Sequence, residues 1–168
     1  MWNFPTPLPD ELIYSTIARA GLHHGIQSPK QLLDEVFQDR KVVATLDLPS
    51  HLNAIVHLLQ RTGRFSLIDL IYQHTMFGLY APFVQECHRQ KAISLMGEQT
   101  SGSVHLMLGL NASRIPNNTK LHYCPICIQQ QREGYGEYFW NRDWIIPNLL
   151  ICLKHGCSLL AHDDIKQQ

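Results

Sequence analysis

The sequence has no run of apolar residues approaching the about 20 that a membrane-spanning helix needs, so we expect no membrane segment. It also has no basic start followed by an apolar stretch, so we expect no secretion signal. The net charge is zero as well, because 14 Lys and Arg residues balance 14 Asp and Glu residues. Proteins that depend on nonspecific contact with nucleic acid usually carry a clear positive excess. We therefore expect a cytoplasmic protein without a strong general affinity for nucleic acid.

Patterns that mark common enzyme active sites are also missing. The sequence contains no nucleophile elbow, no phosphate-binding loop and no EF-hand. A nucleobase deaminase requires His-x-Glu upstream of Pro-Cys-x-x-Cys, whereas this chain has no His-x-Glu and carries its proline inside the cysteine pair. Nine of the ten histidines are scattered without a repeating ligand spacing. We expect a protein that is not an enzyme, and a metallonuclease is disfavoured because no carboxylate–histidine cluster accompanies the cysteines.

Apolar residues make up 45% of the 168 residues, which is typical of a globular chain with a substantial core. The first 110 residues repeat apolar positions at intervals of three and four, which predicts a series of short helices. No alternating segment of useful length appears there, so we expect no sheet in this half. Short helices joined by short turns favour a mainly α fold, a helix-turn-helix-like bundle. The same spacing of apolar residues is also typical of a compact helical core that has no nucleic-acid role, and the pattern alone does not separate the two.

Capping residues indicate where several of these helices begin. Ser28-Pro29-Lys30-Gln31 has a serine cap, a proline at the first helical position and a glutamine at the third. Ser66 with Asp69 three residues later predicts another start, and Pro49-Ser50 predicts a third. A last helix is expected over residues 102–110. Glycines are expected to end the helices, at Gly21, Gly63 and Gly97.

A polar, turn-forming stretch over residues 114–119 marks a change in composition. We place a boundary there, between a helical region over residues 1–113 and a zinc-finger subdomain over residues 114–168. A short strand is expected near residues 121–123, and a short helix over residues 126–132. The aromatic and β-branched residues between positions 138 and 146 are expected to surround a metal with an apolar shell.

Two pairs of metal-ligand residues are the most informative feature of the sequence. Cys124 and Cys127 lie three positions apart, and so do Cys152 and His155. Each pair fits one tight turn, and three thiols with one imidazole complete a tetrahedron that leaves no position open for water. The pattern predicts a structural Zn²⁺ site of the Cys₃His type. The alternative, two unrelated pairs, requires that both share the ligand spacing by chance.

The remaining cysteines are Cys87 and Cys157. Cys157 lies two residues past His155 and is a rival ligand, but its place beyond Gly156 favours packing beneath the turn. Cys87 lies in a helical stretch, and we expect an ordinary buried thiol there.

Three basic residues lie on the segment expected to bind metal, namely Arg132, Arg142 and Lys154. They are candidates for contacts with DNA phosphates, which position a duplex without reading its sequence. A solvated basic face is the simpler interpretation, and we prefer it. Trp140 and Trp144 are expected to pack rather than to stack on bases.

Long blocks of the sequence resemble one known family from end to end. They are Asn3-Phe4-Pro5, residues 11–21, 28–35, 40–46, 48–52, 79–84 and 104–109, Tyr123-Cys124-Pro125-x-Cys127, Tyr135-Gly136-Glu137, Arg142-Asp143-Trp144 and Cys152-x-Lys154-His155-Gly156. On these blocks the chain is similar to the N-terminal part of the TniQ/TnsD family of transposon target-site selection proteins.

The resemblance implies a role that the spacings alone do not. Members of this family are not enzymes; they mark the insertion site of a transposon and recruit an AAA+ ATPase, TnsC, which brings the transposase. Some bind a fixed chromosomal site, and others join an RNA-guided CRISPR effector complex. The family's zinc ligands map to Cys124, Cys127, Cys152 and His155. The family's proteins are longer, so their downstream DNA-reading region is expected to be absent here.

We therefore expect a bacterial, nucleoid-associated adaptor that links target DNA to the ATPase. The alternative is a stand-alone, sequence-specific zinc-finger DNA-binding regulator. The two differ in what they bind tightly, because an adaptor holds the ATPase and a regulator holds one DNA site with a steep dependence on salt.

Overall fold

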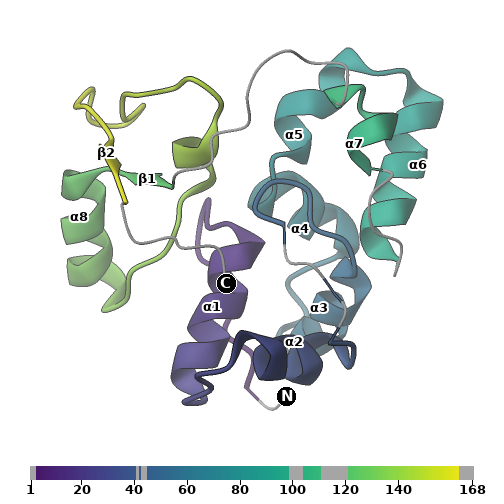
Figure 1. Cartoon of the computed structure of the whole chain (residues 1–168), viewed down its shortest axis with the longest axis horizontal. Helices are drawn as coiled ribbons and strands as arrows, with labels where there is room; N and C mark the ends of the chain where they lie inside the picture. The colour runs from purple at the N-terminus through teal and green to yellow at the C-terminus, as the bar shows by residue number, and fades with distance from the viewer. Residues whose placement is uncertain (1–2, 41, 43–44, 99–103, 111–120, 163–168) are drawn as a thin grey trace. The chain divides into compact units, whose positions relative to one another are not determined.

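The computed structural model describes residues 3–40, 42, 45–98, 104–110 and 121–162. The chain divides into two compact units, Met1–Ser113 and Arg114–Gln168. Eight α-helices and a two-stranded sheet lie in the described part of the chain (Figure 1), which confirms the mainly α fold class. The stretch over residues 114–119, where a boundary is expected, lies outside the described residues.

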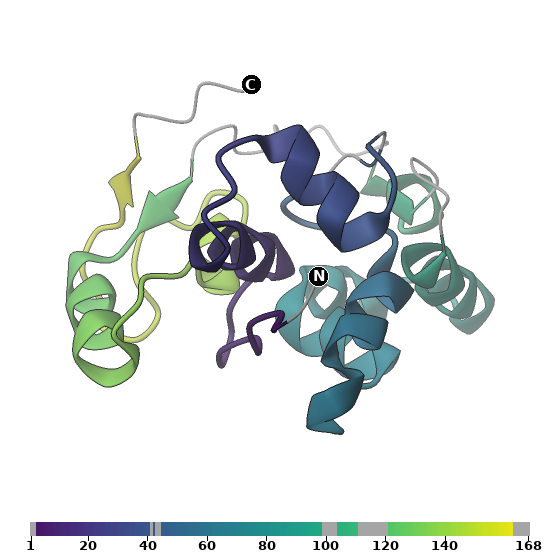
Figure 2. The same cartoon turned by 90° about the horizontal axis from the view of Figure 1, so that it is seen from below.

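The helices of the first unit are short. They are α1 (Ile13–His23), α2 (Pro29–Phe37), α3 (Leu52–Leu59), α4 (Leu67–His74), α5 (Phe77–Tyr80), α6 (Glu86–Gly97) and α7 (Val104–Met107), with 3-10 turns η1 (Gln60–Thr62) and η2 (Ala81–Phe83). α3 packs against α2, α4 and α6, and α6 packs against α7 (Figure 1 and Figure 2). The buried core draws on all seven helices, and Phe77, Leu52 and Leu70 are among its fully buried side chains.

The predicted helix caps form at Ser28 and Ser66. The Ser28 hydroxyl accepts the Gln31 amide, and proline occupies the start of α2. At α4 the capping box is complete, since the Ser66 side chain accepts the Asp69 amide and the Asp69 carboxylate accepts the Ser66 amide. The prediction at Pro49-Ser50 is early, because α3 begins at Leu52.

The prediction that Gly21 ends the first helix is wrong. α1 continues to His23, and Gly25, with φ of 65°, follows its cap. Gly21 lies buried inside α1, where an added Cβ would come within 2.9 Å of a Leu32 methyl group. A larger residue at this position would require the end of the Leu32 side chain to shift, because α1 and α2 approach closely there, which the pattern along one helix does not reveal.

A buried ion pair joins the segment before α1 to α1 itself. Arg19 Nη1 lies 2.8 Å from Glu11 Oε2, and the two side chains are only 8% and 0% exposed. The Ser15 hydroxyl and the Leu8 amide each donate to the Glu11 carboxylate at 2.9 Å. The His74 ring, from α4, lies 2.8 Å through Nδ1 from the Glu11 carbonyl oxygen. Glu11 therefore connects the N-terminal segment and α1 through its carboxylate, and α4 through its backbone carbonyl.

A second ion pair connects residues far apart in the first unit. His105 Nε2, on α7, lies 2.7 Å from Asp47 Oδ2, in the loop before α3, and each side chain is 26% exposed. The hydrogen bond to Asp47 raises the pKa of His105, against burial, which lowers it. Burial acts to raise the pKa of Asp47, but the hydrogen bond and charge of His105 lower it overall.

The second unit contains β1 (His122–Tyr123), α8 (Pro125–Tyr135), η4 (Arg142–Ile145) and β2 (Leu160–Ala161). β1 and β2 pair antiparallel, with His122 opposite Ala161 and Tyr123 opposite Leu160. The expected strand forms, and the expected helix is longer than predicted, ending at Gly136 with φ of 73°. None of the helices in the described part has the length and apolar character that crossing a bilayer demands.

Replacing Arg19 by Met tests the buried ion pair. Burial already raises the pKa of Glu11, against the Leu8 amide and the Arg19 charge, which lower it. Removing the cation leaves a buried carboxylate unpaired, and we expect a loss of about 3–5 kcal/mol in unfolding free energy, measured by urea titration. The matched control is Arg40→Met, which breaks an exposed pair with Asp34 and should cost less than about 1 kcal/mol. Equal losses in both variants would contradict the assignment.

The Asp47–His105 pair predicts a dependence of stability on pH. Since the folded-state pKa of His105 lies above its ordinary 6.5, the contribution is complete below that pH and is lost as the pH rises through the folded pKa. The folded-state pKa of Asp47 lies below its ordinary 3.8. The stability that ionised Asp47 contributes is therefore present above pH 3.8 and is lost only as the pH falls through the lower, folded-state pKa.

We expect His105→Gln to cost up to about 1 kcal/mol near pH 5.5, and progressively less toward pH 9, in thermal unfolding of the first unit. His88→Gln, which removes an exposed histidine of α6, is the control and should follow the wild-type profile. A constant difference between His105→Gln and wild type across this range would refute the role of the pair.

Candidate metal centre

The first ligand pair is positioned by the start of α8. Cys124 is the N-cap of the helix, with extended backbone, and its Sγ accepts the Cys127 amide at 3.4 Å. Pro125 occupies the first turn, where its missing N–H leaves no donor unsatisfied. Both thiols therefore face the same side of one helical turn.

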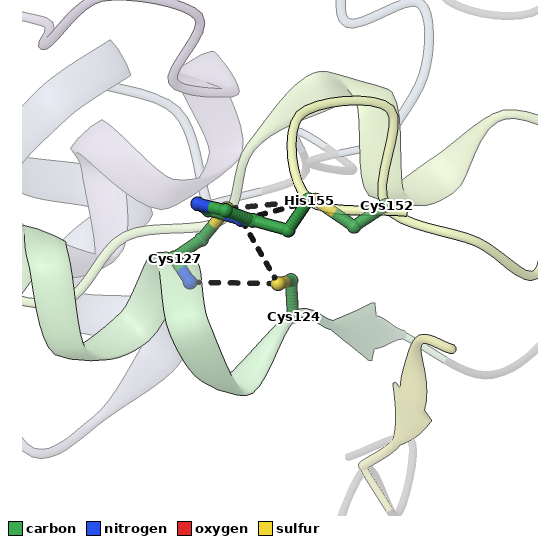
Figure 3. A group of neighbouring side chains, drawn as sticks. All are labelled: Cys124, Cys127, Cys152 and His155. Atoms are coloured by element: carbon green, nitrogen blue, oxygen red, sulfur yellow. Dashed lines mark hydrogen bonds between the residues drawn. The ribbon is translucent and has the colours of Figure 1, made fainter. Parts of the chain in front are cut away.

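The second pair is positioned by a tight hairpin turn. The Cys152 amide donates to the Cys157 carbonyl, and the Gly156 amide donates to the Cys152 carbonyl, both at 2.8 Å. Gly156 has φ of 65°, a conformation that side chains rarely adopt, so glycine allows the chain to reverse here. The turn places the Cys152 thiol and the His155 ring on its inner side (Figure 3).

The two turns bring three sulfurs and one ring nitrogen together, as Figure 3 shows. His155 Nδ1 lies 3.3 Å from Cys127 Sγ and 3.5 Å from each of Cys124 Sγ and Cys152 Sγ. Cys127 Sγ and Cys152 Sγ are 3.7 Å apart. All four ligand atoms lie within 4.8 Å of one another. The predicted Cys₃His cluster is present.

These distances fit a tetrahedral metal site. Bond lengths of about 2.3 Å to sulfur and about 2.0–2.1 Å to nitrogen give tetrahedron edges of about 3.8 Å between sulfurs and about 3.5 Å between sulfur and nitrogen. The Cys127–Cys152 separation and the three contacts of His155 Nδ1 match these edges. With Nδ1 as the ligand atom, Nε2 of the neutral ring carries the proton.

The electrostatics of the thiols also favour a bound cation. Burial acts to raise the pKa of Cys124, but hydrogen bonds from the Cys127 amide and the neighbouring groups lower it to about 6. Burial and the adjacent sulfurs of Cys152 and Cys124 raise the pKa of Cys127 to about 12. The sulfurs therefore resist ionising together, and a divalent cation at their centre removes that repulsion.

Apolar side chains pack around the cluster. Trp144 is 2% exposed and Leu159 is 8% exposed, and both belong to a buried group with Cys124 and Cys152. Trp140 packs against the same group, with its ring centroid 6.2 Å from that of Trp144 in an edge-to-face arrangement. Both tryptophans therefore pack as expected, although Tyr138, from the same aromatic stretch, is 53% exposed.

The three basic candidates lie on separate elements of this unit. Arg132 is exposed on α8, and Arg142 is half-buried at the start of η4. Lys154 is exposed between the second pair of ligands, and its Nζ donates to Gln130 Oε1 of α8 at 2.7 Å. This last contact joins the two ligand-bearing turns, which gives Lys154 a structural role that the sequence did not indicate.

The other two cysteines differ from each other in their surroundings. Cys157 Sγ lies 3.4 Å from Cys124 Sγ, but Cys157 is not part of the four-residue group. The prediction of a buried Cys87 is wrong, because this thiol is exposed. Cys87 lies in the first turn of α6, whose buried positions are Ala92, Ile93, Met96 and Gly97.

Comparison with known proteins gives two matches that cover the chain. The TniQ family model matches residues 3–159. Over all of its length the chain is 56% identical to the transposon Tn7 transposition protein TnsD of Escherichia coli, and it covers 34% of that protein. The chain therefore spans about a third of the length of this curated relative.

Metal removal should unfold the second unit selectively. Structural zinc contributes on the order of 10 kcal/mol or more to folding of small units. Before heating, the folded second unit should give a near-ultraviolet circular dichroism signal from Trp140 and Trp144. We expect EDTA or the substitution Cys124→Ser to abolish this signal. The far-ultraviolet helix signal of the first unit should persist. Cys87→Ser, which removes an exposed thiol, is the control and should behave as wild type. If wild type, Cys124→Ser and Cys87→Ser all unfold identically when heated without EDTA, the structural role of the cluster is refuted.

Proposed function

The chain belongs to the TniQ family, and from that membership we propose that it is a target-site selection adaptor in DNA transposition. The observation that carries the proposal is the 56% identity to TnsD along the entire chain. The alignment spans both units, so it includes the helical bundle and the metal centre alike. The adaptor works in the bacterial cytoplasm, at the nucleoid DNA that the transposon enters.

The partner of such an adaptor is the AAA+ regulator TnsC, which in turn brings the transposase. The balance of 14 basic against 14 acidic residues supports a segment that meets protein more than DNA, since phosphate contacts require a local excess of Lys and Arg. Target DNA is then a second partner, held weakly by this segment. The basic residues Arg132 and Lys154 are exposed and available for such contacts.

We propose that Cys124, Cys127, Cys152 and His155 hold one structural Zn²⁺. The tetrahedral spacing of the ligand atoms supports this assignment, as does the donor set of three thiols and one imidazole. Protein atoms fill all four positions, so the ion stabilises the turns and activates no water. The role proposed here is accordingly one of binding and recruitment, without catalysis.

Capture of TnsC tests the adaptor function. We expect immobilised wild-type protein to retain the AAA+ ATPase of the same transposon in the presence of ATP, and elemental analysis of the bait to find one zinc per chain. Its affinity for target DNA should be weak, with a logarithmic salt slope no steeper than about −2. A regulator that acts alone would give the opposite pattern, namely no ATPase capture and a steep slope at one DNA site.

Two variants accompany this experiment, each with its thermal unfolding measured, because capture is lost either with a contact or with the fold. Cys124→Ser should lose zinc and ATPase capture together, which by itself does not distinguish the two causes. Arg132→Ala retains the ligands, and it should leave capture unchanged while reducing the DNA salt slope by at most about one unit. Failure of folded, zinc-loaded wild-type protein to retain the ATPase would refute the proposed function.

A further inference from the structure

A fourth thiol touches the candidate metal centre without belonging to its four-residue group. Cys157 Sγ lies 3.4 Å from Cys124 Sγ, closer than the 3.7 Å between Cys127 Sγ and Cys152 Sγ. Cys124 is fully buried, whereas Cys157 is partly exposed. A ligand sulfur is therefore in contact with a thiol that is open to small molecules from the solvent.

The backbone holds this contact in place. The hydrogen bond from the Cys152 amide to the Cys157 carbonyl closes the same hairpin that carries Cys152 and His155. Ile151 and Ser158 form a bridge just outside it, and the Leu159 amide donates to the Leu150 carbonyl at 2.8 Å. The position of Cys157 thus follows from the turn that forms the second ligand pair.

We propose that Cys124 and Cys157 form an oxidative modification site, at which hydrogen peroxide produces a disulfide and withdraws Cys124 from the metal-ligand set. The metal-release part of this proposal rests on the proposed zinc site. The disulfide itself requires only the two thiols. Closing the gap from 3.4 Å to a bond of about 2.05 Å is a movement of about 1.4 Å, within the range of side-chain rotation on a short hairpin.

The chemistry balances in two steps. First, the Cys157 sulfur takes one oxygen from peroxide as the O–O bond breaks, giving a sulfenic acid, and the other oxygen leaves as water with the thiol proton. Second, the Cys124 sulfur attacks the Cys157 sulfur, the S–S bond forms, the S–O bond breaks, and the hydroxyl group leaves as water after taking a proton. Two electrons pass from the sulfurs to peroxide, and a dithiol reductant returns them.

Another pair of sulfurs competes for the same oxidant. Cys127 and Cys152 are 3.7 Å apart, but both belong to the four-residue metal group. Cys157 is outside that group and is partly exposed, so we expect oxidation to begin there. The exposed Cys87 provides an internal reference, because it lies in the other unit with Gln85 as its neighbour.

The test compares wild type, Cys157→Ser and Cys87→Ser, each with its zinc content measured before treatment. Hydrogen peroxide is added, zinc release is followed with a colorimetric chelator, and disulfides are mapped by differential alkylation and mass spectrometry. In wild type we expect a Cys124–Cys157 peptide that appears together with released zinc. Cys157→Ser should release zinc about tenfold more slowly, since the accessible attacking site is gone. Cys87→Ser should behave as wild type, and dithiothreitol with zinc should restore the metal content.

Two results would overturn the proposal. One is equal zinc release from Cys157→Ser and wild type, and the other is a map that contains Cys127–Cys152 without Cys124–Cys157. If Cys157→Ser does not contain its full amount of zinc before treatment, Cys157→Ala replaces it as the test variant. Untreated wild-type protein without zinc would refute the metal assignment and the release step, and the disulfide map would still decide whether the Cys124–Cys157 pair forms.

Discussion

The second unit depends on the meeting of two short turns, and three thiols and one imidazole converge at the point where they meet. The buried apolar group of this unit contains Cys124, Trp144, Cys152 and Leu159, so half of it consists of cluster cysteines. Small units with few buried apolar side chains usually depend on a metal or on disulfides to offset the entropy of ordering the chain. The first unit differs, because its core draws on seven helices.

Local structure prepares both turns before any ion is bound. An N-cap with proline behind it fixes the first pair, and a glycine with positive φ fixes the second. The contact between Lys154 and Gln130 then joins one turn to the helix that begins in the other. Such preorganisation lowers the ordering cost that metal binding has to overcome.

The sequence predicted those features whose cause lies within a few residues. The helix starts at Ser28 and Ser66 depend on side chains three positions away, and the spacing of the ligand pairs depends on one turn each. The cluster forms from the predicted residues, while their binding of zinc stays a prediction. Features that depend on packing between segments were missed, notably the Glu11–Arg19 pair and the close approach of Leu32 to Gly21. Cys157 was expected to pack beneath the turn, but its contact with the Cys124 sulfur was not predicted. Hydrophobic periodicity also failed at Cys87, because α6 has no clear apolar face near its start.

The close approach of Leu32 to Gly21 has a consequence for how this sequence can vary. Any side chain added at Gly21 requires the end of the Leu32 side chain to shift, so the separation of α1 and α2 limits which residues fit at that position. Gly134, on α8, is different, since a Cβ there meets no atom within 4 Å. Of these two glycines in helices of similar length, Gly21 requires a neighbouring side chain to move when a larger residue replaces it, whereas Gly134 leaves space for one.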